Sequence, residues 1–242
     1  MILKNKVAIV TGANRGLGKS ISIKLASEGA CVILAGRNEP ALRTVKAEIE
    51  SNGGKADIAV IDITDFDNIQ SAVESILQKH KTIDILVNNA GISKEMPLID
   101  MPVEVWDEII NINLRSVMLF TKAVLPVMTA NKRGNIVNIS SAAALRGLPG
   151  SSAYAASKAG VVCLSQALGD ELRPCGIRVN AICPGPVDTE LFQKSAKREF
   201  ILQAGGDVFE PETVANGVLY LASDLSKGMS SQILTIRGFN RW

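Results

Sequence analysis

The amino-acid sequence predicts an α/β fold: a single doubly wound domain with a seven-stranded parallel sheet and helices on both of its faces. Short β-branched runs alternate with longer amphipathic stretches along the whole chain, which is the order of right-handed βαβ units. The 242 residues are 47% hydrophobic, as expected when a parallel sheet is buried on both faces. No linker, charge block or low-complexity tract divides the chain, so residues 1–242 are expected to form one domain.

Seven short segments rich in β-branched residues are predicted to be the strands: residues 7–10, 31–35, 56–61, 83–88, 135–140, 178–183 and 233–236. The amphipathic stretches between them predict helices over residues 18–28, 39–52, 65–80, 103–131, 153–172 and 211–223. Pro126 lies inside the fourth helix, where its missing N–H donor predicts a kink or a break. The least regular stretch, residues 186–206, is expected to be a substrate flap, since loops carry specificity on such scaffolds.

Charge and hydrophobicity exclude two classes of partner. Lys and Arg number 26 against 24 for Asp and Glu, and this net charge of +2 does not favour nucleic acid. No apolar run approaches the ~20 residues that a membrane helix requires. Residues 1–6 lead into the first strand without a signal-peptide pattern, so we expect a cytoplasmic protein without a membrane partner.

The cysteines and the single histidine argue against metal or hydrolase chemistry. Cys31, Cys163, Cys175 and Cys183 form no C-x-x-C pair, which favours reduced, packed thiols over a metal site or a disulfide framework. His80 lies in a polar segment, where a solvated side chain is expected. A Ser-His-Asp hydrolase and a multi-histidine metal site are therefore both disfavoured, and we expect no metal.

A glycine-rich turn joins the first strand to the first helix. Its glycines are spaced G-x-x-x-G-x-G, and glycine lets a backbone turn tightly and approach a diphosphate at the positive end of the following helix. The turn predicts a nucleotide-binding loop with contacts from Gly12, Asn14, Arg15, Gly16, Leu17 and Gly18. Glycine-rich turns are common, so a plain turn before a helix is the alternative.

The end of the second predicted strand indicates which dinucleotide this loop would bind. NAD sites usually place a carboxylate there for the ribose 2′-hydroxyl, whereas a 2′-phosphate needs cations. Gly36 occupies that position, Arg37 follows it, and Arg15 could flank the same phosphate. The sequence therefore favours NADP(H), the alternative being that both arginines are ordinary surface residues.

A tyrosine and a lysine stand four residues apart in the helix predicted over residues 153–172. The spacing of Tyr154 and Lys158 places both on one helical face. A phenol with a pKa of ~10 is a poor acid–base catalyst at neutral pH, and a nearby ammonium would lower that pKa. Ser140 and Ser141 end the fifth predicted strand and would face the same crevice, while Asn113 lies in a helix without an obvious packing role.

Taken together and in order, these motifs resemble the short-chain dehydrogenase/reductase family over essentially the whole chain. Besides the glycine-rich turn and Tyr154-x-x-x-Lys158, three further segments match the family pattern: Asp62 with Ile63, Asn88-Asn89-Ala90-Gly91, and residues 184–189. The resemblance implies a Rossmann-type fold and a cofactor site that also includes Asp62, Ile63, Asn89, Ala90, Gly91, Tyr154, Lys158, Pro184, Gly185, Val187 and Thr189.

The resemblance also implies a role for each candidate catalytic residue. Tyr154 would exchange a proton with the substrate oxygen, and Lys158 would lower the pKa of this tyrosine and bind the nicotinamide ribose. Ser141 would hydrogen-bond the carbonyl oxygen and stabilise the negative charge that develops on it. Asn113 would hold a water that links Lys158 to solvent. Substrate contacts would come from residues 92–97, residues 142–151 and the flap, which are mostly uncharged.

Three functions fit this pattern. One is a 3-oxoacyl-(acyl-carrier-protein) reductase acting on a carrier-protein thioester. The chain resembles these reductases in Arg15 and in Lys132-Arg133, although Cys175 stands where they tend to carry a basic residue. Another is a reductase or dehydrogenase for a free small-molecule carbonyl or alcohol. A catalytically silent cofactor-binding regulator is the third, and the retained Tyr154 and Lys158 argue against it. The family also implies a homo-oligomer, a tetramer or a dimer, although residues 230–232 and 237–242 depart from its C-terminal pattern.

Overall fold

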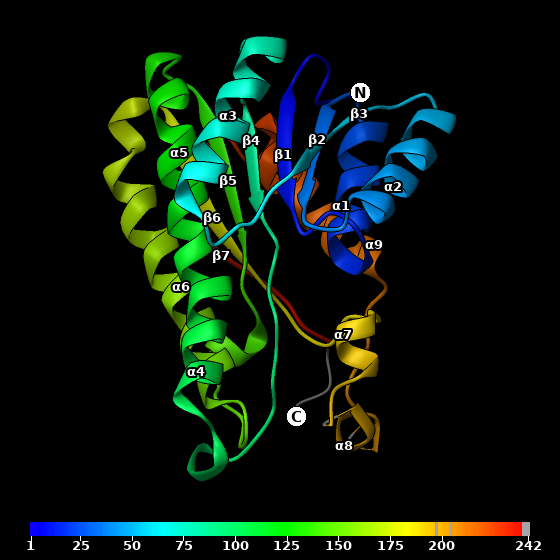
Figure 1. The fold of residues 1–242 in the computed structure, drawn as a ribbon, viewed down its shortest axis with the longest axis vertical. Helices are drawn as coiled ribbons and strands as arrows, with labels where there is room; N and C mark the ends of the chain where they lie inside the picture. Colours follow the sequence, from blue (N-terminus) through cyan, green and yellow to red (C-terminus); the bar gives the residue numbers. More distant parts are fainter. Residues whose placement is uncertain (197, 204, 239–242) are drawn as a thin grey trace.

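A computed structural model of the chain describes residues 1–196, 198–203 and 205–238. Its centre is one parallel sheet with the strand order β3-β2-β1-β4-β5-β6-β7 (Figure 1). The strands are β1 (Val7–Thr11), β2 (Cys31–Gly36), β3 (Lys55–Val60), β4 (Ile85–Asn88), β5 (Gly134–Ile139), β6 (Ile177–Pro184) and β7 (Ile233–Ile236). Every predicted strand is present, which confirms the doubly wound seven-stranded sheet.

Helices cover both faces of the sheet, as predicted. One face carries α1 (Gly16–Ser27), α2 (Glu39–Ser51) and α9 (Pro211–Ala222), and the other carries α3 (Phe66–His80), α5 (Ser116–Ala130) and α6 (Ser152–Glu171) (Figure 1). The shorter helical segments are α4 (Val103–Ile110), α7 (Glu190–Gln193) and α8 (Arg198–Gln203), with 3-10 turns at Leu98–Asp100, Ala142–Ala144, Arg173–Cys175 and Asp224–Ser226. None of the helices in the described ranges has the length and apolarity to cross a membrane.

The core follows from the alternation of side chains along buried parallel strands. In β1, Ala8 and Val10 face the layer of α1, α2 and α9, whereas Val7 and Ile9 face the layer of α3 and α5. All five residues of β1 are buried, so the strand is apolar on both faces. The rigid sheet built in this way holds the loops at its carboxyl edge in fixed positions.

Of the kink or break predicted at Pro126 in the helix over residues 103–131, the break does not occur. Helix α5 runs through Pro126 to Ala130. Proline removes the N–H that would bond the carbonyl of Lys122, and both residues are exposed, so water can satisfy that carbonyl. The irregularity lies instead at Asn111–Arg115, a π turn between α4 and α5 in which Ser116 N–H donates to the Asn111 carbonyl.

The strand order reverses between β1 and β4, which are neighbours although β2 and β3 intervene in the sequence. In a doubly wound sheet this switch point opens a crevice outside the carboxyl ends of the strands, and ligands bind there. The loops after β1, β4, β5 and β6 all emerge at that edge. The predicted cofactor and catalytic residues belong to these loops and to the helices that follow them, except for Arg37, Asp62 and Ile63, which follow β2 and β3 at the same edge.

Candidate active site

A cavity of about 680 Å³ lies at the carboxyl edge of the sheet, between the switch point and the flap. Every residue of the predicted cofactor set lines it, from Gly12 in the first loop to Thr189 in the flap, and so does Ser141. Asn113 is the exception among the predicted site residues, because it lies behind the lining. The fold thus gathers segments more than 170 residues apart in sequence around one space.

The glycine-rich loop has the shape of an anion cradle. Gly12 and Gly16 have φ angles of 65° and 51°, and a Cβ atom on Gly18 would lie 2.2 Å from the Gly12 carbonyl oxygen. Helix α1 begins at Gly16 with no side-chain cap from Arg15 and no acid in its first turn. The amide groups of that turn can therefore receive a phosphate.

Hydrogen bonds fix the end of β4 against this loop. The Asn89 side-chain amide donates to the Thr11 carbonyl at 2.9 Å, and the Ala90 N–H donates to the Thr11 hydroxyl at 3.1 Å. These bonds explain why the motif at residues 88–91 accompanies the glycine-rich turn. They hold the floor of the cavity at a constant distance from the cradle.

The two arginines predicted to hold a 2′-phosphate both line the cavity, but they differ in their partners. Arg15 forms an ion pair with Glu190 of the flap, a contact that the sequence did not predict. Near Arg37, hydrogen bonds from Thr64 lower the pKa of Asp62, and the charge of Arg37 lowers it further. The corner beside Gly36 thus combines one exposed arginine with an ionised aspartate that is already hydrogen-bonded.

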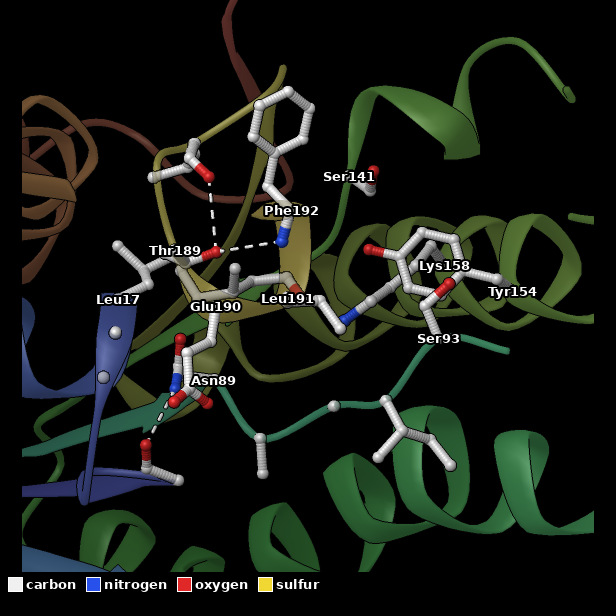
Figure 2. A pocket seen from close by; sticks show the side chains of 18 of the residues that line it. Leu17, Asn89, Ser93, Ser141, Tyr154, Lys158, Thr189, Glu190, Leu191 and Phe192 are labelled. Carbon is white, nitrogen blue, oxygen red and sulfur yellow. Dashed lines mark hydrogen bonds between the residues drawn. The ribbon is translucent and has the colours of Figure 1, made fainter. Parts of the chain in front are cut away.

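Tyr154 and Lys158 lie together in α6, inside the cavity (Figure 2). Lys158 Nζ donates to the Ile139 carbonyl at 2.9 Å and lies 5.9 Å from the centroid of the Tyr154 ring. The Lys158 side chain is only 4% exposed, and this burial lowers its pKa to about 8. The lysine is therefore still mostly protonated at neutral pH.

The pKa of Tyr154 departs from the expectation. Burial raises it, a hydrogen bond with Ser141 lowers it, and the charge of Glu95 raises it further, with a net upward shift. The predicted lowering by Lys158 is thus not achieved by the protein alone, because desolvation of the phenolate dominates. Ser141 itself is held in place because its hydroxyl also accepts from the Ala143 N–H at 3.1 Å.

Asn113 is fully buried in the π turn, and its side chain holds the loop after β4 in place. Its Oδ1 accepts from the Ile92 N–H at 2.8 Å, and its Nδ2 donates to the Ile92 carbonyl at 2.9 Å and to the Ser157 hydroxyl at 3.1 Å. A Cβ atom on Gly91 would lie 3.3 Å from both Asn113 Oδ1 and Lys158 Nζ. Asn113 therefore stands directly behind the lysine, separated from the cavity by Gly91.

Glu95 lies in residues 92–97, the segment predicted to contact substrate, but the sequence did not single it out. It lines the cavity with Tyr154, and its Oε1 accepts from the Ser195 hydroxyl of the flap at 2.8 Å. Its Oε2 is buried, and no described residue hydrogen-bonds it. Nothing in the sequence around Glu95 indicates that its carboxylate lies beside Tyr154. This carboxylate makes the substrate side of the cavity more acidic than the mostly uncharged segment predicts.

The flap is more regular than predicted. Residues 186–206 contain α7 and α8, and residues Thr189 to Phe192 face the cavity (Figure 2). The Thr189 hydroxyl donates to the Val187 carbonyl at 3.2 Å and caps α7 by accepting from the Phe192 N–H at 3.5 Å. The Glu190 ion pair and the Ser195 hydrogen bond tie the flap to opposite ends of the cavity.

Comparisons with known proteins agree with this geometry. Residues 6–199 match the family model described as short chain dehydrogenase. The chain is 41% identical to the 3-oxoacyl-(acyl-carrier-protein) reductase FabG of Thermotoga maritima over 98% of both chains, and 38% identical to the cyclopentanol dehydrogenase of Comamonas testosteroni over 98% of this chain and 97% of that one. The solved structure of a 7α-hydroxysteroid dehydrogenase complexed with NADH and a 7-oxo bile acid superposes with a TM-score of 0.94 at 33% identity, covering 98% of this chain and 95% of the other.

Proposed function

Because the chain belongs to the short-chain dehydrogenase/reductase family, whose members are oxidoreductases of CH–OH and C=O groups, we propose that it is an NADP(H)-dependent carbonyl reductase with Tyr154 as its proton donor. One observation carries this proposal: Tyr154, Ser141 and Lys158 line the same cavity as the glycine-rich cradle. An acid, a hydroxyl donor and a buried cation are the groups that carbonyl reduction requires of the protein.

The residues present fit a nicotinamide dinucleotide. The turn at Gly12 and Gly16, both with positive φ angles, and the uncapped start of α1 suit a diphosphate, and the cavity continues from there to Tyr154. When bound, this cofactor supplies or accepts the hydride, and the protein supplies orientation and electrostatics.

In the proposed reduction, the Tyr154 hydroxyl gives its proton to the substrate oxygen and the Ser141 hydroxyl donates a hydrogen bond to the same oxygen. The ammonium of Lys158 favours the phenolate that remains, which makes the proton easier to release. Asn113 acts through position: its bonds to Ile92 hold the loop over Lys158. In the reverse direction the Tyr154 phenolate removes the alcohol proton.

We propose NADP(H) rather than NAD(H) because Gly36, and not an acid, ends β2 and the exposed Arg37 beside it lines the cavity. One relative of this shape was solved with NADH, so the fold by itself does not decide between the two dinucleotides. The deciding measurement is kcat/KM for NADPH and for NADH with one substrate at fixed ionic strength. A preference for NADH would exclude the 2′-phosphate assignment.

The first substrate to test is a 3-oxoacyl thioester, because several of the most similar relatives are reductases of carrier-bound 3-oxoacyl groups. Glu95 supports an esterified substrate, since its buried carboxylate would repel the carboxylate of a free 3-oxo acid. A small cyclic or secondary alcohol is the second candidate, supported by the likeness to cyclopentanol dehydrogenase and by Cys175 in place of a basic residue.

These two substrates are separated by following NADPH oxidation with an acetoacetyl thioester and with a panel of free ketones, including cyclopentanone. A kcat/KM at least tenfold higher for the thioester supports the first candidate, and the opposite ratio supports the second. Absence of turnover with every substrate, together with tight NADPH binding, would favour the cofactor-binding regulator.

We further propose that the chain acts as a homo-oligomer, a dimer or a tetramer. Large apolar side chains are exposed around α4 and α5, with Ile99 93% and Val103 69% exposed, and such surfaces are commonly covered in an assembly. The C-terminal departure at residues 237–242 lies mostly outside the described residues. Sedimentation equilibrium of the purified protein tests this proposal, and a monomer at micromolar concentration contradicts it.

A further inference from the structure

A cluster of three potential ligand side chains lies at the amino edge of the sheet, opposite the cavity. Cys31 begins β2, Asp57 lies near the start of β3, and His80 ends α3. The polar segment around His80 predicts a solvated histidine, and this prediction is wrong, because the His80 side chain is only 15% exposed. The sheet register brings these residues together although up to 49 positions separate them.

Hydrogen bonding fixes the orientation of the histidine ring. His80 Nε2 lies 2.8 Å from Asp57 Oδ2, and Lys79 Nζ lies 2.8 Å from Asp57 Oδ1. The Lys79 ammonium forms an ion pair with the Asp57 carboxylate, and His80 approaches the same carboxylate. An ionised carboxylate only accepts hydrogen bonds, so Nε2 carries the proton and a neutral ring has its lone pair on Nδ1.

That lone pair is directed at the thiol, since His80 Nδ1 lies 4.0 Å from Cys31 Sγ. A zinc ion bound to both atoms at about 2.3 Å from sulfur and about 2.0 Å from nitrogen would place them about 3.5 Å apart in tetrahedral geometry. The required closure is only a few tenths of an ångström. A carboxylate on the far nitrogen is also the usual companion of a metal-bound histidine, because it fixes the tautomer and orients the ring.

We propose that Cys31 and His80 bind a thiophilic divalent cation of the Zn²⁺ type, with Asp57 orienting the histidine and water completing the coordination. Both oxygens of Asp57 already accept hydrogen bonds, so this residue acts behind the ligand rather than as one. A thiolate together with an imidazole binds zinc in preference to calcium or magnesium, which favour oxygen ligands.

Charge limits the strength of the site. Burial and the charge of Asp57 raise the pKa of the Cys31 thiol, and Lys79, Lys55 and Lys46 offset this shift only in part, so the thiol must release a proton when a metal binds. The positive charges of the same lysines oppose an incoming cation. Two protein ligands instead of the four of a structural zinc site predict a Kd on the order of 10⁻⁶ to 10⁻⁴ M. The site is therefore one that fills at elevated metal concentration.

The test is a titration of the full-length, reduced protein with Zn²⁺ by calorimetry and with Cd²⁺ by thiolate-to-metal ultraviolet absorption. We expect one equivalent to bind the parent protein and no binding to the Cys31→Ser and His80→Gln variants. Asp57→Asn should weaken binding by roughly 10- to 100-fold. The matched control is Cys163→Ser, which removes an exposed thiol elsewhere and should leave the titration unchanged.

A thermal measurement keeps the test independent of any one variant. Zn²⁺ at 100 times Kd should raise the Tm of the parent by about 5 °C and leave that of His80→Gln unchanged. The proposal is overturned if the parent binds no Zn²⁺ at millimolar concentration, or if binding survives in both His80→Gln and Cys31→Ser. Neither outcome involves the cavity, so the test does not depend on the proposed reductase activity.

Discussion

Lys158 Nζ lies 5.9 Å from the centroid of the Tyr154 ring, and on α6 the lysine is buried while the tyrosine is half-buried and lines the cavity. The phenol that must exchange a proton and the ammonium that must keep its charge are thus placed where desolvation disfavours their charged forms. Burial lowers the pKa of Lys158 and raises that of Tyr154, so in the protein alone both shifts favour the neutral forms. The positive nicotinamide ring of an oxidised cofactor would favour the phenolate.

The burial of Lys158 predicts a measurable pH dependence of stability. Its pKa falls from 10.5 in the unfolded chain to about 8, so between these values the unfolded state binds more protons and stability rises with pH. Below pH 8 the charged lysine costs about 3 kcal/mol. We expect Lys158→Met to be more stable than the parent at pH 7, with the difference shrinking towards pH 10. Urea unfolding of both proteins from pH 7 to 10 measures this, and a constant difference contradicts it.

Tyr154→Phe should remove the proposed acid without changing the shape of the cavity. We expect kcat to fall by about 10²- to 10⁴-fold, the usual contribution of a general acid, while the Kd for NADPH stays within a factor of about three. Stopped-flow turnover and quenching of protein fluorescence by NADPH measure the two quantities. Turnover at the parent rate would show that another group supplies the proton.

Glu95→Gln tests the electrostatic link between the substrate side and Tyr154. The negative charge of Glu95 raises the pKa of Tyr154, so its removal should lower that pKa. The rate of alcohol oxidation, which needs the phenolate, should then reach its plateau at a lower pH. The control is Glu108→Gln, whose carboxylate pairs with Lys94 on the surface. Identical pH profiles for Glu95→Gln and the parent would show that the charge does not act on Tyr154.

Arg37→Asp tests the choice of dinucleotide. Loss of a charge-assisted contact with a 2′-phosphate should raise the KM for NADPH on the order of 100-fold and change the KM for NADH far less. Arg15→Gln provides a comparison, because Arg15 already pairs with Glu190 and should contribute less. Equal effects of Arg37→Asp on the two dinucleotides would refute the assigned role.

Gly18→Ala tests the cradle itself. The added methyl would meet the Gly12 carbonyl oxygen at 2.2 Å, so the loop must shift, and we expect a loss of about 1–3 kcal/mol in unfolding free energy together with weaker NADPH binding. Gly228→Ala is the matched control, because nothing lies within 4 Å of its added Cβ. Comparable stability of the two variants in urea would indicate that the cradle adapts more freely than its geometry suggests.

Much of the fold could be predicted from sequence because it depends on local patterns. The prediction for β7 matches the structure at both ends, and the other strands agree within about two residues, since β-branched runs bounded by turns identify buried parallel strands. The motifs around the cavity could also be recognised from the sequence, because each follows a strand at the same edge of the sheet.

The remaining features depend on distant residues. The pairing of Glu95 with Ser195, of Arg15 with Glu190 and of Cys31 with His80 each joins segments with no shared local signal. Pro126 misled the prediction because the cost of its missing N–H depends on whether water reaches the freed carbonyl. The direction of the Tyr154 pKa shift depends on burial, which the spacing of Tyr154 and Lys158 does not reveal.

The π turn at Asn111–Arg115 determines how much the length of the chain can vary there. Each residue rotates a helix by about 100°. Loss of one residue from the turn would restore regular α-helix, but it would swing Asn113 away from Ile92 or rotate the buried Ile109 of α4 towards solvent. Insertions and deletions should therefore be rejected between Ile109 and Val117, whereas the exposed turn at Gly53, where an added Cβ would meet no atom within 4 Å, should accept them.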